Sequence, residues 1–268
     1  MTLMRHLEPP SPRNAAAPRT GERQRGIDRV IGVLELLLRQ RQPMGAGEIA
    51  RALGAPRSTV YEIVNRLVEA GMLEPAGNDG QVFFGRAMHL FGHAYLNGDS
   101  GLRRFGEALD ALSAATGATV QCCTRRGAKY VVLDCRDGTG AFRITSEVGA
   151  EVPLPWTASG RVLLGHLSDA EILDLVPPQD FQLPNGTTLS QHRFLADVAQ
   201  ARETGFFEST GLASSYTWCQ AVPVFSRNGI AAFTLCFVLP IDSGADQRSR
   251  CLNLLRDKAR QLSHVQVG

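Results

Sequence analysis

The sequence has no long hydrophobic run. Its longest apolar stretch, from Gly229 to Ile241, has the length of a strand and falls short of a bilayer-spanning helix. The residues that follow Met1 alternate polar groups with prolines and offer no apolar core for a signal peptide. We therefore expect a cytoplasmic protein that has no membrane partner.

Motifs for catalysis and for metal binding are also missing. The sequence has no Gly-x-Ser-x-Gly elbow and no glycine-rich phosphate loop, and no histidine stands in a recognisable relation to the possible nucleophiles Ser159, Cys219 and Cys236. His89 and His93 are four residues apart but have no acidic or cysteine partner nearby, which favours polar helix positions over metal ligands. We expect no enzymatic activity, no metal and no cofactor.

The cysteines show no metal-ligand spacing, and most lie in apolar, strand-like surroundings. In a reducing compartment this setting is typical of buried free thiols. The six are Cys122, Cys123, Cys135, Cys219, Cys236 and Cys251.

A strong net charge is missing as well, since the formal value is +2. Residues 1–75 hold 11 arginines against 8 acidic side chains, whereas residues 101–268 hold 16 charges of each sign. The small basic excess lies in the N-terminal part. It is compatible with a nucleic-acid partner but does not by itself indicate one.

The sequence does contain a helix-turn-helix pattern. Glu48–Leu53 forms a short helix that ends at Gly54, because glycine has no Cβ and accepts a left-handed turn. Pro56 suits the first turn of the helix that follows. That second helix repeats apolar residues at helical spacing, namely Val60, Ile63, Val64, Leu67 and Val68. In a helix-turn-helix, the second helix enters the major groove of DNA.

Two short helices joined at a glycine also occur in all-α domains that do not bind DNA. The polar face of the second helix favours DNA binding, because its side chains can donate to phosphates and base edges and it lacks the Glu/Lys pairs of a merely solvated helix. This face consists of Arg57, Ser58, Thr59, Tyr61, Glu62, Asn65 and Arg66.

The flanking segments extend the pattern to a winged helix-turn-helix. Residues 27–41 predict an apolar-striped scaffold helix, and residues 72–74 and 81–84 predict two strands around a turn at 76–80. The tip of this wing has no basic residue, so we expect it to position the domain on DNA without adding much affinity. We place the domain at 25–85, after a disordered arm at 1–24 and before a linker helix at 86–100.

Residues 101–268 show mixed helix and strand signals. Strands are predicted at 118–124, 129–135, 141–148, 206–209, 217–225 and 230–239. Helices are predicted at 102–116, 157–166, 169–175, 188–204 and 243–264. Hairpin-like strands flanked by helices indicate an antiparallel sheet and an α+β fold.

Five segments carry a resemblance that covers nearly the whole chain. They are Glu48–Ala50 and Ala55–Tyr61 in the first half, and Thr116–Gln121, Val152–Arg161 and Cys219–Phe225 in the second. In this order and spacing they resemble the IclR family of bacterial transcriptional regulators. The resemblance implies a winged helix-turn-helix, a linker helix and a GAF-like effector-binding domain. It therefore implies a ligand-responsive regulator, by default a repressor, with an activator of a catabolic operon as the alternative.

The resemblance implies a homo-oligomer, either a dimer or a dimer of dimers, that binds a palindromic double-stranded DNA operator. The base-reading surface falls on the seven polar residues of the second helix. Arg57 and Arg66 suit phosphates or guanine, and Asn65 suits adenine. Glu62 stands where the family commonly has a basic residue, which indicates a different operator sequence.

The resemblance also implies an effector pocket on the concave sheet, where the backbone N–H groups near Ala158 and Ser159 would face a carboxylate. The implied walls are Ile144, Val152, Trp156, Thr217, Cys219 and Cys236, with Ser209 at the mouth. Trp156, Cys236 and Val238 are more apolar than the family pattern, so we expect a small organic acid with an aromatic or hydrophobic body. Ordinary core packing is the alternative for each of these residues.

Two further functions stay open at this point. One is a thiol-based redox sensor at Cys122–Cys123 or Cys236, although apolar neighbours raise the pKa of a thiol and make it inert. The other is a winged helix that contacts a protein in place of DNA.

Overall fold

The computed structural model describes residues 26–77, 80–98, 100–139 and 147–263. They fall into two compact units that meet in the sequence between Asp99 and Ser100. Within these ranges, no helix combines the length and the apolar character needed to cross a bilayer.

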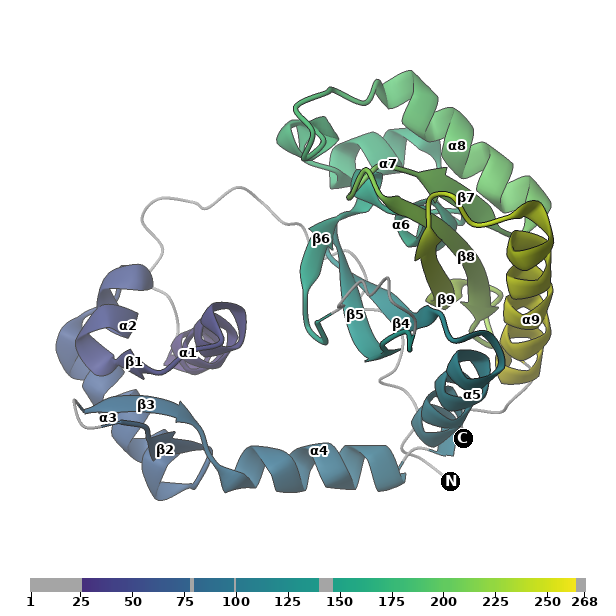
Figure 1. Ribbon diagram of the computed structural model, residues 1–268. Coiled ribbons are helices and arrows are strands. Elements are labelled where there is room, and N and C mark those ends of the chain that lie inside the picture. Colours follow the sequence, from purple (N-terminus) through teal and green to yellow (C-terminus); the bar gives the residue numbers. More distant parts are fainter. Residues whose placement is uncertain (1–25, 78–79, 99, 140–146, 264–268) are drawn as a thin grey trace. The chain divides into compact units, whose positions relative to one another are not determined.

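The first unit is a bundle of three helices around a small apolar core (Figure 1). Helix α1 spans Gly26–Gln40, α2 spans Ala46–Ala52 and α3 spans Arg57–Glu69. Each helix buries one face because its apolar residues recur at helical spacing. The core consists of Val33, Leu36, Leu37, Ala46, Ile49, Ala50, Val60, Val64, Leu67, Leu73 and Val82.

Gly54 makes the turn between α2 and α3. Its φ of 60° lies in the left-handed region, which costs a residue with a Cβ about 1–2 kcal/mol. The N–H of Ala55 donates to the Ala50 carbonyl at 3.0 Å and closes the turn. Pro56 stands at the cap position of α3, where its carbonyl accepts from the Val60 N–H at 3.1 Å. The predicted helix-turn-helix is thus confirmed.

The wing is a three-stranded antiparallel sheet with the order β1-β3-β2. Its strands are β1, Met44–Gly45; β2, Leu73–Pro75; and β3, Gln81–Phe84. The β2–β3 hairpin was predicted. Strand β1 was not, because two residues are too few to show an alternating pattern. Residues 78–79 of the hairpin loop and the N-terminal arm predicted at 1–24 lie outside the described residues.

Helix α4, Arg86–Gly98, follows the wing directly. The N–H of Arg86 donates to Glu74 at 3.0 Å, and the N–H of Ala87 donates to the Gly71 carbonyl at 3.0 Å. These two bonds anchor the start of α4 to the first unit.

The second unit is a six-stranded antiparallel sheet with helices on both faces (Figure 1). The strands are β4, Thr119–Arg126; β5, Lys129–Arg136; β6, Glu151–Pro153; β7, Phe207–Thr210; β8, Thr217–Phe225; and β9, Ala231–Pro240. Their order is β6-β5-β4-β9-β8-β7. The helices are α5, Ser100–Thr116; α6, Ala158–Leu163; α7, Asp169–Leu175; α8, Gln191–Thr204; and α9, Ala245–Ser263. Two 3₁₀ turns are η1, Leu154–Trp156, and η2, Pro178–Phe181.

The two faces of this sheet pack against different helices. Helices α5 and α9 lie side by side over one face, where Leu109, Phe237 and Leu255 belong to the main apolar core. Helix α6 lies over the opposite face, which we call the inner face. The predicted α+β architecture is confirmed.

The structure differs from the sequence predictions at two places in this unit. Most of the strand predicted at 141–148 lies outside the described residues, and Glu147 and Val148 belong to a turn. The edge strand beside β5 is β6, which is only three residues long and ends at Pro153. The turns η1 and η2 were also missed, because prolines at 153, 155, 177 and 178 interrupt the periodicity on which the prediction relied.

Candidate functional site

Helix α3 presents the polar face that the sequence predicted. Val60, Val64 and Leu67 are buried against α1 and α2. The opposite face exposes Arg57, Ser58, Tyr61, Glu62, Asn65 and Arg66, whereas Thr59 is half-buried. Six of the seven candidates are therefore available to a partner.

Two of these side chains extend across to α2. A Cβ built on Gly47 would lie 4.0 Å from both the Arg57 guanidinium and the Tyr61 hydroxyl. The tips of both side chains therefore lie over the first turn of α2. Lower on α3, Arg66 pairs with Glu69 at 3.2 Å with both groups exposed, a geometry that contributes little to stability.

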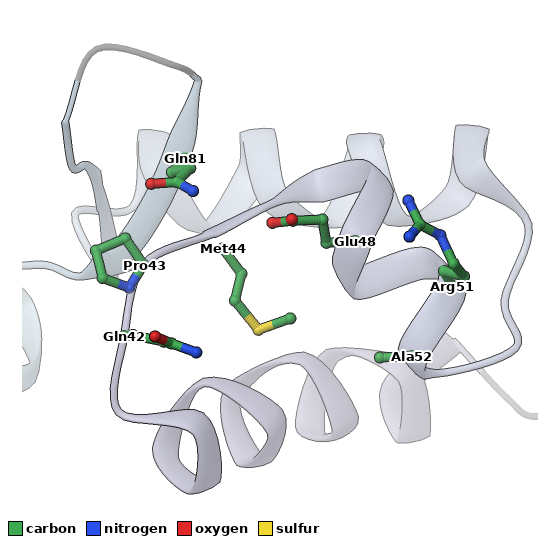
Figure 2. A pocket seen from close by; sticks show the side chains of 7 residues that line it. All are labelled: Gln42, Pro43, Met44, Glu48, Arg51, Ala52 and Gln81. Atoms are coloured by element: carbon green, nitrogen blue, oxygen red, sulfur yellow. The ribbon is translucent and has the colours of Figure 1, made fainter.

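Beside α2 lies an open hollow of about 500 Å³ (Figure 2). Its lining is Gln42, Pro43, Met44, Glu48, Arg51, Ala52 and Gln81. The Glu48 carboxylate accepts the Gly45 N–H at 2.8 Å, so it is held in place at the start of α2. With one acid and one base among its lining residues, the hollow has no net charge that selects an anion.

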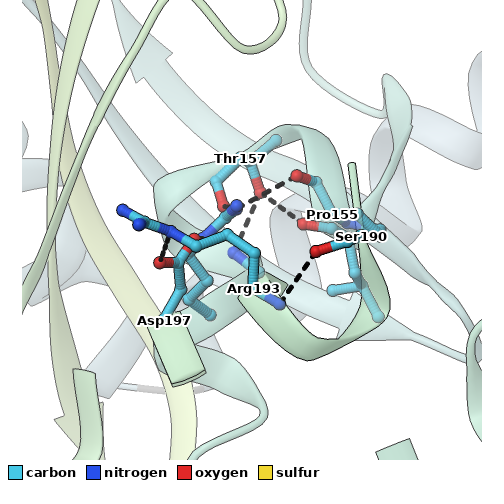
Figure 3. Close-up of polar contacts among 8 residues, drawn as sticks. Pro155, Thr157, Ser190, Arg193 and Asp197 are labelled. Carbon is cyan, nitrogen blue, oxygen red and sulfur yellow. Dashed lines mark hydrogen bonds and ion pairs between the residues drawn. The ribbon is translucent and has the colours of Figure 1, made fainter. Parts of the chain in front are cut away.

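In the second unit, Arg161 of α6 organises a buried polar network, whose partners Pro155, Thr157 and Asp197 are labelled in Figure 3. The side chain is 1% exposed, and its Nε donates to Asp197 of α8 at 3.0 Å. Its Nη1 donates to the carbonyls of Pro155 and Thr157 at 3.0 and 2.9 Å. Burial lowers the pKa of Arg161, and the Asp197 carboxylate opposes that shift. Arg193, which is exposed, reaches the same carboxylate at 3.0 Å.

The loop before α6 is fixed by backbone packing as well. The Thr157 hydroxyl accepts the Gly160 N–H at 2.9 Å. A Cβ on Gly160 would lie 2.1 Å from the Leu154 carbonyl oxygen, so the backbone approaches there as closely as only glycine allows. Ala158 and Ser159 are consequently held against the inner face of the sheet.

The inner face brings together most of the predicted effector-site residues. Ser209 of β7 pairs directly with Cys219 of β8, and Cys236 of β9 is a buried neighbour of Ala158. Thr217 precedes Cys219 by two residues and shares its face. Val152 pairs with Tyr130 at the edge of the sheet. Ser159 reaches this cluster from α6, and its hydroxyl lies beside the Cys236 thiol.

Two predicted pocket residues have a different outcome. Ile144 lies outside the described residues. Trp156 is half-buried in η1, where its indole N–H donates to the Asp180 carbonyl of η2 at 2.8 Å. That hydrogen bond fixes the orientation of the indole and engages its only donor.

Sequence reasoning did not place four polar residues in the effector site, although it named Cys123 as a redox candidate. The thiol of Cys123 donates to the Tyr130 hydroxyl at 2.9 Å, and that hydroxyl donates to Gln121 at 2.5 Å. Burial raises the pKa of both Cys123 and Tyr130. The Thr234 hydroxyl is buried nearby. The period-2 pattern of β4 and β9 could have placed Gln121, Cys123 and Thr234 on this face.

The thiols differ in ionisation. Burial raises the pKa of Cys122. The pKa of Cys236 is raised mainly by a hydrogen bond between Cys236 and Cys219, and also by burial. The pKa of Cys219 is lowered, first by the hydrogen bond with Cys236 and then, against burial, by the Thr217 and Ser209 hydroxyls. The thiols named for redox sensing are thus held protonated. Cys135 and Cys219 are half-buried, which corrects the expectation that all six would be buried.

His89 and His93 are exposed on α4 with their ring centroids 6.4 Å apart. The described part of the chain holds no group of three or more His, Cys, Asp or Glu side chains suited to a metal ion.

A helix-turn-helix with an exposed polar second helix and a β-wing defines a winged-helix DNA-binding protein, here joined to an α+β unit. Residues 26–77 match the family model of the IclR helix-turn-helix domain. Residues 93–264 match that of the bacterial transcriptional regulator IclR C-terminal domain. The chain therefore belongs to the IclR family of bacterial transcriptional regulators, which bind DNA and are not enzymes.

Individual relatives agree with this assignment. The regulator XynR of Escherichia coli K12 is 26% identical over 213 residues, covering 78% of this chain and 84% of XynR. KdgR of Dickeya chrysanthemi is 24% identical over 237 residues, covering 88% of this chain and 77% of KdgR.

Solved structures share the fold. An IclR regulator from Alicyclobacillus acidocaldarius matches with a TM-score of 0.80 at 20% identity, over 90% of this chain and 98% of that one. An IclR homolog from Microbacterium hydrocarbonoxydans, complexed with 4-hydroxybenzoate, matches with a TM-score of 0.74 at 24% identity, over 89% and 98%.

Proposed function

We propose that this regulator is a repressor that binds a palindromic operator as a homo-oligomer and responds to a small organic acid with an aromatic or hydrophobic body. The single observation that carries the ligand part is the convergence of Ser159, Ser209, Thr217, Cys219 and Cys236 on one sheet face beneath α6. Relatives named as transcriptional repressors, IclR and AllR of Escherichia coli, support the sign of regulation.

For DNA reading, the exposed face of α3 supplies complementary chemistry. Arg57, whose tip lies over the start of α2, suits a phosphate or a guanine. Asn65 suits adenine in the major groove, and Glu62 can accept from cytosine. Ser58 and Tyr61 supply hydroxyls for the backbone.

A two-fold oligomer is supported by apolar side chains that the first unit leaves exposed. Ile27, Ile31 and Leu38 lie on α1, and Leu90, Phe91 and Tyr95 lie on α4. Exposed apolar side chains gathered on a helix mark an interaction site, and a symmetric dimer would pair two recognition helices with two half-sites. Light scattering on the purified chain tests this, and a monomer at the DNA-binding concentration would contradict it.

For the effector, the inner face supplies apolar walls and a few hydroxyls. Ala158, Val162, Phe207, Ala221 and Val238 form one buried apolar cluster with Cys236. The Ser159 hydroxyl, at the start of α6, can donate a hydrogen bond to a carboxylate. The relative from Microbacterium hydrocarbonoxydans was solved with 4-hydroxybenzoate, a compound of the proposed class.

Effector binding would act by changing the relative placement of the DNA-binding domains through the helix at 86–97. Both half-sites could then no longer be occupied together, and the operator would be released.

Calorimetry with a panel of acids tests the ligand class. We expect aromatic acids such as 4-hydroxybenzoate to bind more tightly than two-carbon oxoacids, because the walls are apolar. Tight binding of a small hydrophilic acid with no response to any aromatic acid would overturn the assignment.

A further inference from the structure

The three thiols of the inner face differ in exposure. Cys123 and Cys236 are buried, and the Cys123 thiol donates to Tyr130 at 2.9 Å. Cys219 is half-buried, so among these three residues it is the one that retains accessible surface. A molecule that reaches this face would therefore contact Cys219 before Cys123 or Cys236.

The surroundings of Cys219 favour its thiolate. Ser209 stands directly opposite on β7, at the distance of a cross-strand pair. The Thr217 hydroxyl donates to the Ser214 carbonyl at 2.9 Å, which leaves Ser209 as the hydroxyl donor among the described neighbours. Hydrogen bonding, first with Cys236 and also with Ser209, lowers the pKa of Cys219 against the effect of burial.

A second feature of this face indicates a ligand. The Ser159 hydroxyl is 1% exposed and has no hydrogen-bond partner among the described residues, although it lies beside the Cys236 thiol. A buried hydroxyl without a partner costs free energy unless something binds to it. Ala158, Val162 and Val238 supply apolar surface next to it. A ligand with an apolar body and an oxygen acceptor would fit these groups.

The geometry points to Cys219 as a covalent capture site for α,β-unsaturated carbonyl compounds that have an apolar body. The inference rests on the proposed function, since it places the electrophile in the proposed effector site. The thiol of Cys219 first gives its proton to solvent. Its sulfur then attacks the β-carbon, a C–S bond forms, and the C=C π bond breaks to give an enolate. The enolate takes a proton from water, so the thiol adds across the double bond without an oxidant or a reductant.

Alkylation rates test the site directly. The full chain is treated with N-ethylmaleimide or N-phenylmaleimide, and each cysteine is followed by peptide mass spectrometry. Cys135 is the matched reference, because it is also half-buried but burial and the carboxylates of Asp137 and Asp134 raise its pKa. We expect Cys219 to react several-fold faster than Cys135, because hydrogen bonding lowers the pKa of Cys219 whereas burial raises that of Cys135. The phenyl compound should be faster than the ethyl one at Cys219 alone.

Three variants complete the comparison. Cys219→Ser removes the fast adduct, Cys135→Ser leaves it in place, and Ser209→Ala slows it several-fold without changing the rate at Cys135. Equal rates at Cys219 and Cys135, or a fast adduct that survives Cys219→Ser, would overturn the inference.

The functional consequence is read from DNA binding. Wild-type chain labelled at Cys219 should release a bound operator fragment, whereas Cys219→Ser treated in the same way should keep it. Labelling at Cys219 that leaves DNA affinity unchanged would contradict a regulatory role. If the unlabelled chain shows no sequence-specific DNA binding, the proposed function fails, while the rate comparison still decides whether Cys219 is the reactive thiol.

Discussion

The recognition helix α3 and the inner face of the sheet differ in how the chain builds them. The seven α3 candidates lie between Arg57 and Arg66 on one helix, where local periodicity alone separates the exposed residues from the buried ones. The inner face collects residues from Gln121 to Cys236 on separate strands and on α6. A surface on one helix can be read from its own segment, whereas an assembled face depends on strand pairing that the sequence does not display.

The two regions also differ in how much a substitution affects the stability of the fold. Side chains on the outer face of α3 are mostly solvent-exposed, so substitutions there alter binding with little effect on stability. Residues of the inner face are mostly buried, so a substitution there can change ligand binding and stability together. The following experiments separate the two effects.

The largest expected effect is on stability, from Arg161→Leu. This change leaves the Asp197 carboxylate and two backbone carbonyls without their buried guanidinium partner. Removing one member of a buried ion pair costs about 3–5 kcal/mol of unfolding free energy. Urea denaturation followed by tryptophan fluorescence reports on the second unit, because both tryptophans, Trp156 and Trp218, lie there.

Arg193→Leu is the matched control for this change. It removes the exposed partner of the same carboxylate, and we expect a loss below about 1 kcal/mol. Equal losses in the two variants would mean that burial does not govern this network.

Asn65→Ala tests the exposed face of α3. Loss of a bidentate contact to a base should weaken operator binding by about 1–3 kcal/mol, with the unfolding free energy and acid affinity unchanged. Anisotropy titration of operator DNA measures operator binding, and calorimetry measures acid affinity. Val64→Ala, one residue earlier and buried, is the contrast, because it should lower stability. If Asn65→Ala lowers operator affinity and acid affinity equally, α3 is a core helix and not a DNA-recognition helix.

Ser159→Ala examines the inner face with a change that removes only a hydroxyl. Because this hydroxyl has no partner among the described residues, its loss should leave stability unchanged or slightly raised. Affinity for the acid should fall by about 0.5–1.5 kcal/mol if the hydroxyl donates to the ligand. A loss of stability with unchanged acid affinity would assign Ser159 to core packing.

The smallest effect is expected from Glu69→Gln, which breaks the exposed pair with Arg66. Stability should change by less than about 0.5 kcal/mol. The released guanidinium can bind a phosphate, so the slope of log affinity against log salt should steepen by up to about 1. An unchanged slope would place Arg66 away from the DNA backbone.

The sequence predicted the first unit well because its signals are local. Gly54, Pro56 and the apolar spacing from Val60 to Leu67 specify the helix-turn-helix without any distant contact. The β2–β3 hairpin follows from the turn residues between its strands. Among the described elements of this unit, the prediction missed β1, which is two residues long.

In the second unit the predictions weakened where structure depends on distant partners. The network of Arg161 with Asp197 joins residues on two helices, and no local pattern marks it. Tyr130 lies next to Gln121 in the candidate site because β4 pairs with β5. The short strand β6 and the proline-rich turns lack the length that a periodicity argument needs.

The most direct test is a titration of the purified chain against DNA from upstream of its own and neighbouring genes. It is run at several salt concentrations, with and without 4-hydroxybenzoate and other acids, for wild type, Asn65→Ala and Ser159→Ala. We expect tight, sequence-dependent binding that an aromatic or hydrophobic acid weakens. Asn65→Ala should lose the operator preference, and Ser159→Ala should keep it but need more acid for release. If no fragment is bound more tightly than random DNA under any condition, the proposal that α3 reads an operator and the inner face binds an acid is wrong.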